Sequence, residues 1–314
     1  MSELPRATLG RTGLDVTKLG FGAMELRGGR GAMSRRVDPD RARSVLNGVL
    51  DAGINFVDTS PDYGTSEKLI GECISQRRDE FFLASKCGCP VGETGETGER
   101  QTFGRAHIFT RENIRAAVEQ SLRRMRTDHL DLVQFHASPA RSVLEENDSL
   151  TELIALRDEG KLRFIGMSGT LPNLTDHIEM GVFDAFQIPY SAVERDHEES
   201  ISDAAAAGAG TVIRGGVARG FPDPSGPGYA QLPEAFRTRL QERHDRWAAA
   251  GLDDLLEGAS TMEFMLRFTI SHPDMHTTIV GTANPAHLTD NIAAASKGPL
   301  PDDVYEQAKQ RLAA

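Results

Sequence analysis

The feature that most constrains this chain is a repeated unit, in which a helical pattern ends at a glycine and a short apolar run follows at once. In segment 40–52, small and apolar residues recur at the spacing of one helix face, and Gly53 separates it from the apolar run 54–58. Asp38 and Pro39 before this segment are typical of a helix start. The same order recurs at Gly160, at Gly181 and near Gly208–Gly210. Strands that alternate with helices in this way predict βαβ units and a parallel sheet.

Eight apolar runs favour a closed barrel over an open sheet, because strands buried on both faces are apolar throughout. We predict strands at about 19–22, 54–58, 81–86, 131–136, 163–168, 184–189, 211–214 and 277–280. Residues 8–19 before them read as a hairpin around Arg11–Gly13 that would plug the barrel floor. We therefore expect one α/β domain over residues 1–314, a (β/α)8 TIM barrel with an N-terminal β-hairpin.

The glycines near the first predicted strand do not fit a Rossmann fold. Gly20 and Gly22 lie inside that strand, whereas a Rossmann fingerprint places its glycines in the turn between strand and helix. Two long segments, 87–107 and 215–232, follow predicted strands and so project over the C-terminal face of the barrel. Loops of this length are usually functional or disordered.

Composition limits the classes of partner that we expect for the protein and indicates its cellular compartment. The net charge of −11, from 35 basic and 46 acidic residues, argues against nucleic acid as the main partner. No run approaches the roughly 20 apolar residues of a membrane span, and the start MSELPRATLG lacks the apolar stretch of a signal peptide. The three cysteines fit a reducing cytosol. We expect a cytoplasmic protein that binds neither nucleic acid nor a membrane, and no feature of the sequence specifies its oligomeric state.

Cys87 and Cys89 form a Cys-x-Cys pair that could serve a metal or a redox reaction. No second cysteine pair is present to complete a zinc site, and the nine histidines show no ligand spacing such as His-Glu-x-x-His. Residues two apart along a strand are also poorly placed for a disulfide. We therefore expect free thiols and no metal ion.

Titratable side chains follow successive strands at the end where barrel enzymes carry their active sites. Asp58, Lys86 and His136 end the runs 54–58, 81–86 and 131–136, and Tyr63 lies just beyond Asp58. Because the carboxyl ends of barrel strands meet at one mouth, we expect these four side chains to lie together.

Such a group could protonate a carbonyl oxygen while a hydride reaches the carbon. A phenol with a pKa of about 10 is a poor acid near neutrality, and a neighbouring ammonium lowers that pKa. Lys86 would act on Tyr63 in this way, held by Asp58 through a charge-assisted hydrogen bond. His136 would orient the carbonyl and stabilise the developing alkoxide.

Seven segments together resemble the aldo-keto reductase superfamily over nearly the whole chain. They are LGRTGLDVTKLGFGAM (9–24), GINFVDTSPDYGTSEKLIG (53–71), SKCG (85–88), DHLDLVQFH (128–136), GKLRFIGMS (160–168), FQIPYS (186–191) and VGTANPAHLTDN (280–291). The resemblance implies reduction of an aldehyde or ketone, with Asp58, Tyr63, Lys86 and His136 as the catalytic set.

The resemblance also implies NADPH, with NADH as the alternative, bound extended across the barrel mouth. Glycines there would let the backbone approach the cofactor, and a helix start would favour its phosphate. The residues at matching positions are Gly22, Ala23, Met24, Asp58, Ser168, Gln187, Tyr190, Arg214, Gly215, Gly216, Val217, Ala218, Gly220, Gly281, Thr282, Ala283, Asn284, His287 and Asn291.

Three places depart from the family pattern. Gly169 replaces the usual asparagine after Ser168, and Arg214 stands where an aromatic ring usually stacks on the nicotinamide. Gly281 and His287 stand where basic residues often bind the 2′-phosphate. We therefore expect a moderate rather than a strict preference for NADPH.

Two other functions are compatible with parts of the pattern. One is a cofactor-binding regulatory subunit of the kind that this fold provides for ion channels, and the other is a metal-dependent lyase on a barrel. The intact pair of Tyr63 and Lys86 favours a reductase whose partner is a small-molecule carbonyl substrate.

Overall fold

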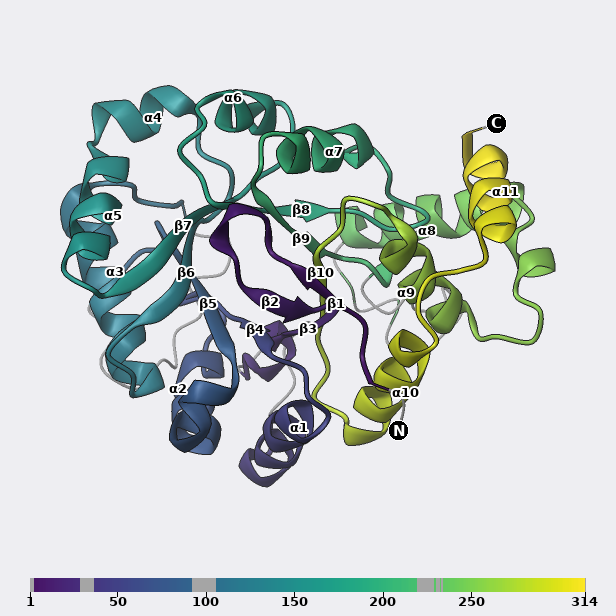
Figure 1. The fold of residues 1–314 in the computed structure, drawn as a ribbon, viewed down its shortest axis with the longest axis horizontal. Helices are drawn as coiled ribbons and strands as arrows, with labels where there is room; N and C mark the ends of the chain where they lie inside the picture. The colour runs from purple at the N-terminus through teal and green to yellow at the C-terminus, as the bar shows by residue number, and fades with distance from the viewer. Residues whose placement is uncertain are drawn as a thin grey trace.

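The protein was analysed as a computed structural model, which describes residues 3–28, 37–91, 106–218, 229, 232 and 234–313. Parallel strands form a closed barrel in the order β10-β3-β4-β5-β6-β7-β8-β9 (Figure 1). Their bounds are β3 (Leu19–Gly22), β4 (Phe56–Asp58), β5 (Phe82–Cys87), β6 (Leu130–Phe135), β7 (Leu162–Ser168), β8 (Ala185–Pro189), β9 (Gly210–Arg214) and β10 (Thr277–Val280). The predicted (β/α)8 barrel is confirmed.

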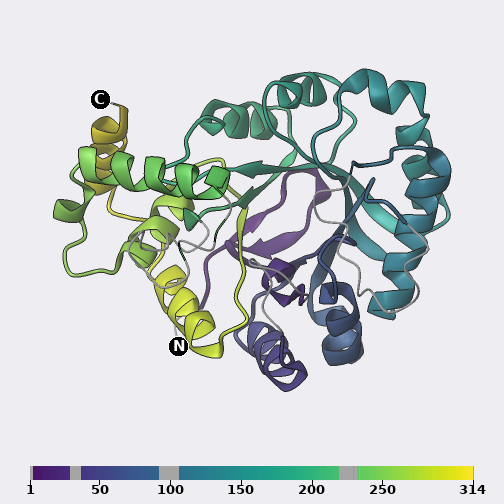
Figure 2. The same ribbon diagram turned by 180° about the vertical axis from the view of Figure 1, so that it is seen from behind.

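Helices surround the barrel on its outside, as the two opposite views show (Figures 1 and 2). They are α1 (Pro39–Asp51), α2 (Ser66–Ile74), α3 (Arg111–Met125), α4 (Arg141–Glu146), α5 (Ser149–Asp158), α6 (Asn173–Glu179), α7 (Glu198–Ala206), α8 (Glu234–Ala249), α9 (Thr261–Ser271), α10 (Pro285–Ser296) and α11 (Asp302–Ala313). Asp38 caps α1 as expected, because its side chain accepts a hydrogen bond from the backbone N–H of Asp40. Within the described part of the chain, no helix combines the length and the apolar character needed to cross a membrane.

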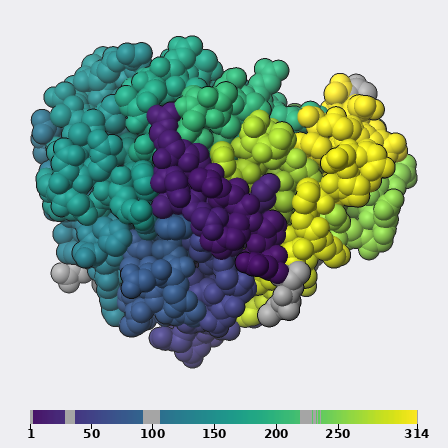
Figure 3. Space-filling view, in the orientation of Figure 1, coloured from purple at the N-terminus to yellow at the C-terminus, as the bar shows by residue number. Residues whose placement is uncertain are grey.

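The N-terminal hairpin covers one end of the barrel. Strands β1 (Arg6–Thr8) and β2 (Asp15–Thr17) pair antiparallel, and Figure 3 shows this segment, in purple, lying across the face of the molecule. Gly10 in its turn has φ +48°, and a Cβ there would lie 2.3 Å from the backbone nitrogen of Gly210. Only glycine allows the hairpin to approach the barrel this closely.

Apolar side chains of the hairpin fill the barrel interior at this end. We call this group the floor cluster: Leu9, Leu14, Val16, Phe56, Ala84, Leu132, Ala185 and Val212. All are buried. The predicted plug of the barrel floor is therefore present, and it is a packed core rather than a lid on an empty channel.

On five strands, the interior side chain two residues beyond the floor cluster is charged or an amide. Residues two apart on a strand share a face, so the interior positions that follow are set by the strand geometry. We call them the mouth group: Asp58, Lys86, Gln134, Gln187 and Arg214. The first four are at most 1% exposed. The barrel thus places a buried polar group directly above an apolar one.

Candidate active site

A buried ion pair lies at the centre of the mouth group. The ammonium of Lys86 donates to Asp58 Oδ1 at 2.6 Å and to the backbone carbonyl of Thr59 at 2.9 Å. The second carboxylate oxygen, Oδ2, accepts from the side-chain amides of Gln134 and Gln187, each at 2.9 Å. Both oxygens of Asp58 therefore have partners, which is the condition under which a buried charge is tolerated.

Lys86 stays charged in this setting. Burial by itself lowers the pKa of Lys86, but the charges of Asp58 and Tyr63 and the hydrogen bond to Asp58 raise it, and the net pKa lies above its ordinary value. The predicted role of Asp58 in holding the ammonium thus has a direct geometric counterpart.

Gln134 is a member of this group that the sequence prediction missed. It stands in β6, two residues after Leu132 of the floor cluster and therefore on the same interior face. That alternation is a usable signal, since an amide on the inner face of a buried strand needs a polar partner.

Tyr63 lies beyond β4 and beside the ammonium. The Nζ atom of Lys86 is 5.2 Å from the centroid of the Tyr63 ring, and the ring of His136 meets it edge-on at 6.3 Å between centroids. Burial raises the pKa of Tyr63, Lys86 lowers it, and the net pKa lies above its ordinary value. The expected effect of Lys86 is present, but burial outweighs it, so the phenol holds its proton.

His136 follows β6 directly, and its backbone N–H donates to the carbonyl of Cys87 at 3.0 Å. Burial lowers the pKa of His136 and Asp62 opposes that change, with a net pKa below the ordinary value. The imidazole is therefore neutral near pH 7 and can offer one N–H to a substrate.

Three residues surround the Nδ1 atom of His136: Cys89, which was expected to be a free thiol, and Asp62 and His107, which the sequence analysis had not selected. Asp62 Oδ2 lies 3.4 Å from it, Cys89 Sγ 3.3 Å and His107 Nε2 3.2 Å. Burial and the carboxylate of Asp62 raise the pKa of the Cys89 thiol. All three cysteines of the chain are buried and unpaired, as expected.

The predicted nicotinamide contacts also lie at the mouth. Ser168 ends β7, and its hydroxyl donates to the amide oxygen of Gln187 at 3.3 Å. At Gly169, which replaces the asparagine of the family pattern, a Cβ would lie 2.7 Å from Leu174 Cδ1. A larger residue at that position would have to shift the end of the Leu174 side chain.

Arg214 ends β9 close enough to Tyr63 and Asp58 for their charges to act on its pKa, which burial lowers below the ordinary value. Its guanidinium has no hydrogen bond or ion pair with any residue that the structure describes. A guanidinium keeps its charge at this site. Arg214 is thus a cation at the mouth that is available to a ligand.

The backbone after β9 turns at Gly215, where φ is +77° and a Cβ would meet no atom within 4 Å. Gly216, Val217 and Ala218 follow and are buried, and the N–H of Ala218 closes the turn on the carbonyl of Gly215 at 2.7 Å. Gly220 lies outside the described residues.

The candidate phosphate-binding residues gather at the carboxyl end of β10. Asn284 caps α10 by accepting from the N–H of Ala286 at 3.1 Å, and Thr282 accepts from the N–H of Asn284 at 2.9 Å. His287 is exposed in the first turn of α10, and Asn291 is half-buried one turn later. Ala283 lies half-buried between Thr282 and the cap.

The end of β3 lies against this segment. A Cβ at Gly281 would lie 2.2 Å from the carbonyl oxygen of Gly22, and Gly22 is also the strand partner of Asp58. Ala23 and Met24 follow directly in a short 3-10 helix (Ala23–Leu26). The predicted contacts on β3 and β10 are therefore adjacent to each other and to the ion pair.

Tyr190 is the predicted cofactor contact that the structure does not bring to this group. Its ring is fully buried, stacks on Phe268 at 5.9 Å and shares a hydrogen bond with the hydroxyl of Tyr305 at 3.2 Å. The side chain packs beneath the outer helices, and its contact with a cofactor stays a prediction.

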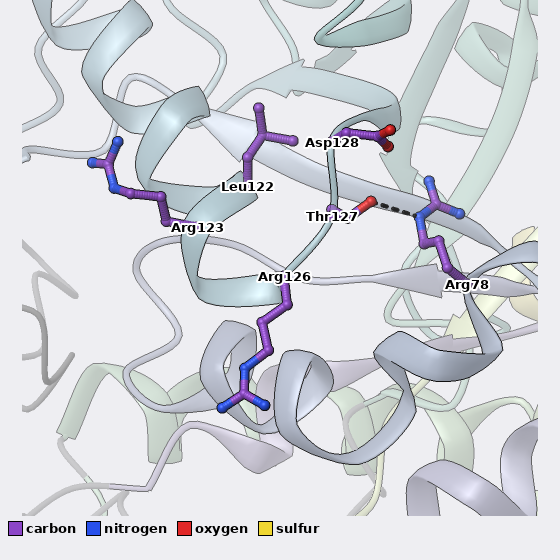
Figure 4. Close-up of a pocket in the computed structure, with 6 residues that line it drawn as sticks. All are labelled: Arg78, Leu122, Arg123, Arg126, Thr127 and Asp128. Atoms are coloured by element: carbon purple, nitrogen blue, oxygen red, sulfur yellow. Dashed lines mark hydrogen bonds between the residues drawn. The ribbon is translucent and has the colours of Figure 1, made fainter.

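A surface pocket lies at the opposite end of the strands (Figure 4). Thr127 and Asp128, which line it, precede β6, and Arg78 precedes β5 and donates to Thr127 Oγ1 at 3.2 Å. Since Asp58, Lys86 and His136 all follow the carboxyl ends of their strands, this pocket is separate from the candidate active site.

A sequence model of the Aldo/keto reductase family matches residues 18–312. The chain belongs to this family. Its relatives include an L-galactose dehydrogenase of Arabidopsis thaliana, 26% identical over 310 residues that cover 95% of this chain and 90% of the relative. A D-threo-aldose 1-dehydrogenase of a Pseudomonas species is 28% identical over 312 residues, which cover 90% of this chain and 91% of the relative.

Among solved structures, an aldo-keto reductase of Bacillus halodurans in its holo form superposes with a TM-score of 0.80. It is 26% identical, and the match covers 98% of this chain and 96% of that one. This aldo/keto reductase family member is therefore an oxidoreductase of carbonyl compounds, and its barrel is the one that its relatives use.

Proposed function

We propose that this protein is an NADPH-dependent reductase of an aldehyde or ketone, with NADH as a weaker alternative. The observation that carries the proposal is the buried pair of Lys86 and Asp58, in which both carboxylate oxygens accept hydrogen bonds, placed against the phenol of Tyr63 at the barrel mouth. A stability role alone does not require this arrangement, since buried ion pairs rarely stabilise a fold more than apolar residues would.

Each residue has one task in the proposed reaction. Tyr63 donates its proton to the carbonyl oxygen, and the ammonium of Lys86 stabilises the phenolate that is left. Asp58 holds the ammonium, and His136 donates a hydrogen bond to the carbonyl oxygen as negative charge develops there. The cofactor, when bound, supplies the hydride.

The residues present fit a nicotinamide dinucleotide. The guanidinium of Arg214, which has no hydrogen bond with a described residue, suits an anionic or aromatic ligand. The start of α10 at Asn284 suits a phosphate, with His287 exposed beside it. The remaining contacts that we propose are Gly22, Ala23, Met24, Asp58, Ser168, Gln187, Tyr190, Gly215, Gly216, Val217, Ala218, Gly220, Gly281, Thr282, Ala283 and Asn291.

The test is consumption of NADPH and NADH with a panel of aldehydes and ketones. Because two relatives are named as sugar dehydrogenases, the panel should also include L-galactose and other aldoses with NADP⁺ and NAD⁺. Tyr63→Phe should lower turnover by roughly 10²- to 10⁴-fold, the usual contribution of a general acid. NADPH binding, measured by fluorescence, should stay unchanged.

Tyr305→Phe is the comparison variant, since the partner of its phenol hydroxyl is Tyr190 rather than Lys86 or Asp58, and it should keep most of the wild-type turnover. If the wild type binds NADPH but turns over no carbonyl or sugar, the regulatory alternative replaces the reductase. A Tyr63→Phe protein that keeps most of its turnover contradicts the role of the phenol.

A further inference from the structure

Four side chains of types that can bind a metal ion lie together beside Tyr63. Asp62, Cys89, His107 and His136 each present one ligand atom, and these atoms all lie within 4.8 Å of one another. Asp62 Oδ2 and His107 Nε2 are 3.4 Å apart, and Asp62, Cys89 and His107 surround His136 Nδ1 at 3.2–3.4 Å. Asp62 and Cys89 are buried, and the two imidazoles are less than one-fifth exposed.

The Nδ1 atom of His136 has more polar neighbours than it can satisfy, although Cys89 Sγ also contacts Ser60 Oγ at 3.5 Å. A ring nitrogen carries either one hydrogen or one in-plane lone pair, so Nδ1 of His136 can satisfy only one of its three neighbours. A cation at the centre would satisfy all four side chains at once. With Zn–N near 2.0–2.1 Å and Zn–S near 2.3 Å, a zinc tetrahedron has ligand–ligand distances of about 3.3–3.6 Å. The four pairs given above lie at 3.2–3.4 Å, and the other two lie within 4.8 Å.

We propose that Asp62, Cys89, His107 and His136 bind one divalent cation of the zinc class in tetrahedral geometry. Thiolate, imidazole and carboxylate are the ligands that zinc takes in proteins. One thiolate and one carboxylate would neutralise the two positive charges of the ion. No linear motif reveals this site, because the ligands come from three segments, and Cys89 and His107 lie at opposite ends of the segment 87–107.

The segments that carry the ligands are held in place by protein contacts. The side chain of Asn113 donates to the carbonyls of Cys89 at 3.1 Å and Ile108 at 2.7 Å, which fixes the chain on either side of residues 92–105. At Gly88, φ is +88° and a Cβ would lie 2.4 Å from the ring of Phe109. His107 stacks on that same ring at 6.1 Å. The site is therefore preorganised.

The ion would position His136, an inference that rests on the proposed function. With Nδ1 on the metal, the hydrogen of the neutral imidazole must sit on Nε2, and no described residue forms a hydrogen bond with that atom. This is the tautomer that donates to a carbonyl oxygen. Four protein ligands leave no open position for substrate, so the ion would not itself touch the substrate.

The experiment measures metal in the whole, untagged protein after exposure to zinc and removal of free ion. We expect one zinc per chain by elemental analysis. Replacement by Co²⁺ should produce intense visible bands of tetrahedral cobalt and a thiolate charge-transfer band. Cys89→Ala should abolish the charge-transfer band, and His107→Ala should lower zinc content. Cys87→Ala is the matched control, because it removes a buried thiol two residues away, and it should keep both signals.

A wild-type protein that holds no more zinc than Cys89→Ala, with no tetrahedral cobalt spectrum, overturns the site. Stripping zinc from the wild type should lower kcat and leave NADPH affinity unchanged, and zinc should restore kcat in the wild type but not in His107→Ala. Inhibition by zinc overturns the positioning of His136. Neither result bears on Tyr63, whose role is tested separately by Tyr63→Phe with NADPH.

Discussion

The floor cluster and the mouth group are built on the same strands, two residues apart, and yet they have opposite chemistry. Phe56 is followed by Asp58 on β4, and Ala84 is followed by Lys86 on β5. At the floor, the hairpin closes the barrel and all side chains of the cluster are apolar. At the mouth, Asp58, Lys86, Gln134 and Gln187 are as well buried, but these side chains are charged or amides.

The difference shows which condition each end of the barrel must meet to be stable. An apolar side chain gains about 1.5–3 kcal/mol from burial wherever it packs. A buried charge costs several kcal/mol unless its partners arrive in the same place, and Asp58 obtains them from three other strands. We therefore expect changes at the floor to affect stability alone, and changes at the mouth to affect turnover first.

Lys86→Met should have the largest effect. It removes the cation that stabilises the phenolate, so turnover should fall by roughly 10²-fold or more. It also leaves Asp58 as a buried carboxylate without its cation, so the free energy of unfolding should fall by about 3–5 kcal/mol. Initial rates and urea unfolding measure the two effects.

The double variant Asp58→Asn with Lys86→Met is the control for this pair. It removes both charges, so it should recover much of the lost stability while turnover stays low. If Lys86→Met alone is as stable as the wild type, the stability of the protein does not depend on the ion pair of Lys86 and Asp58, and the contrast between the two ends fails.

Leu9→Ala should affect the floor alone. Truncation of a buried leucine leaves a cavity and lowers the free energy of unfolding by about 2–5 kcal/mol. The kcat and KM of the folded protein should change little, because Leu9 comes from the hairpin and takes no part in the hydrogen bonds of the ion pair. Ile154→Ala, on an exposed side chain of α5, should change stability by about 0.5 kcal/mol or less. A fall in kcat for Leu9→Ala would show that the two ends are coupled.

Arg214→Tyr should have a smaller effect, on the relative affinities for the reduced and the oxidised cofactor. A cation beside the nicotinamide repels the positively charged oxidised ring more than the neutral reduced ring. The wild type should therefore bind NADPH more tightly than NADP⁺, and the variant should narrow that ratio by roughly fivefold, or about 1 kcal/mol. Fluorescence titration gives both dissociation constants. An unchanged ratio would mean that Arg214 does not lie against the ring.

His287→Arg should have the smallest effect. A guanidinium stays charged and can bind a phosphate through two donors, so the preference for NADPH over NADH should rise by less than about tenfold, which is 1.4 kcal/mol. NADH is the internal control, because it lacks the 2′-phosphate and its affinity should not change. Equal gains for both cofactors would place the 2′-phosphate elsewhere.

Local periodicity made the fold predictable. The alternation of apolar runs with amphipathic helices, and the glycines between them, specified the barrel strands and the hairpin. The ends of β4, β5 and β6 identified Asp58, Lys86 and His136, because parallel strands deliver their carboxyl ends to one mouth.

The tertiary structure alone decided two kinds of feature: those that depend on burial, and those that depend on which segments lie next to each other. The pKa of Tyr63 lies above its ordinary value because burial outweighs the charge of Lys86, and no sequence pattern measures that balance. Gln134 acquires its role only because Asp58 lies opposite it. Asp62, Cys89, His107 and His136 follow three different strands, and only the tertiary structure brings their ligand atoms within 4.8 Å of one another.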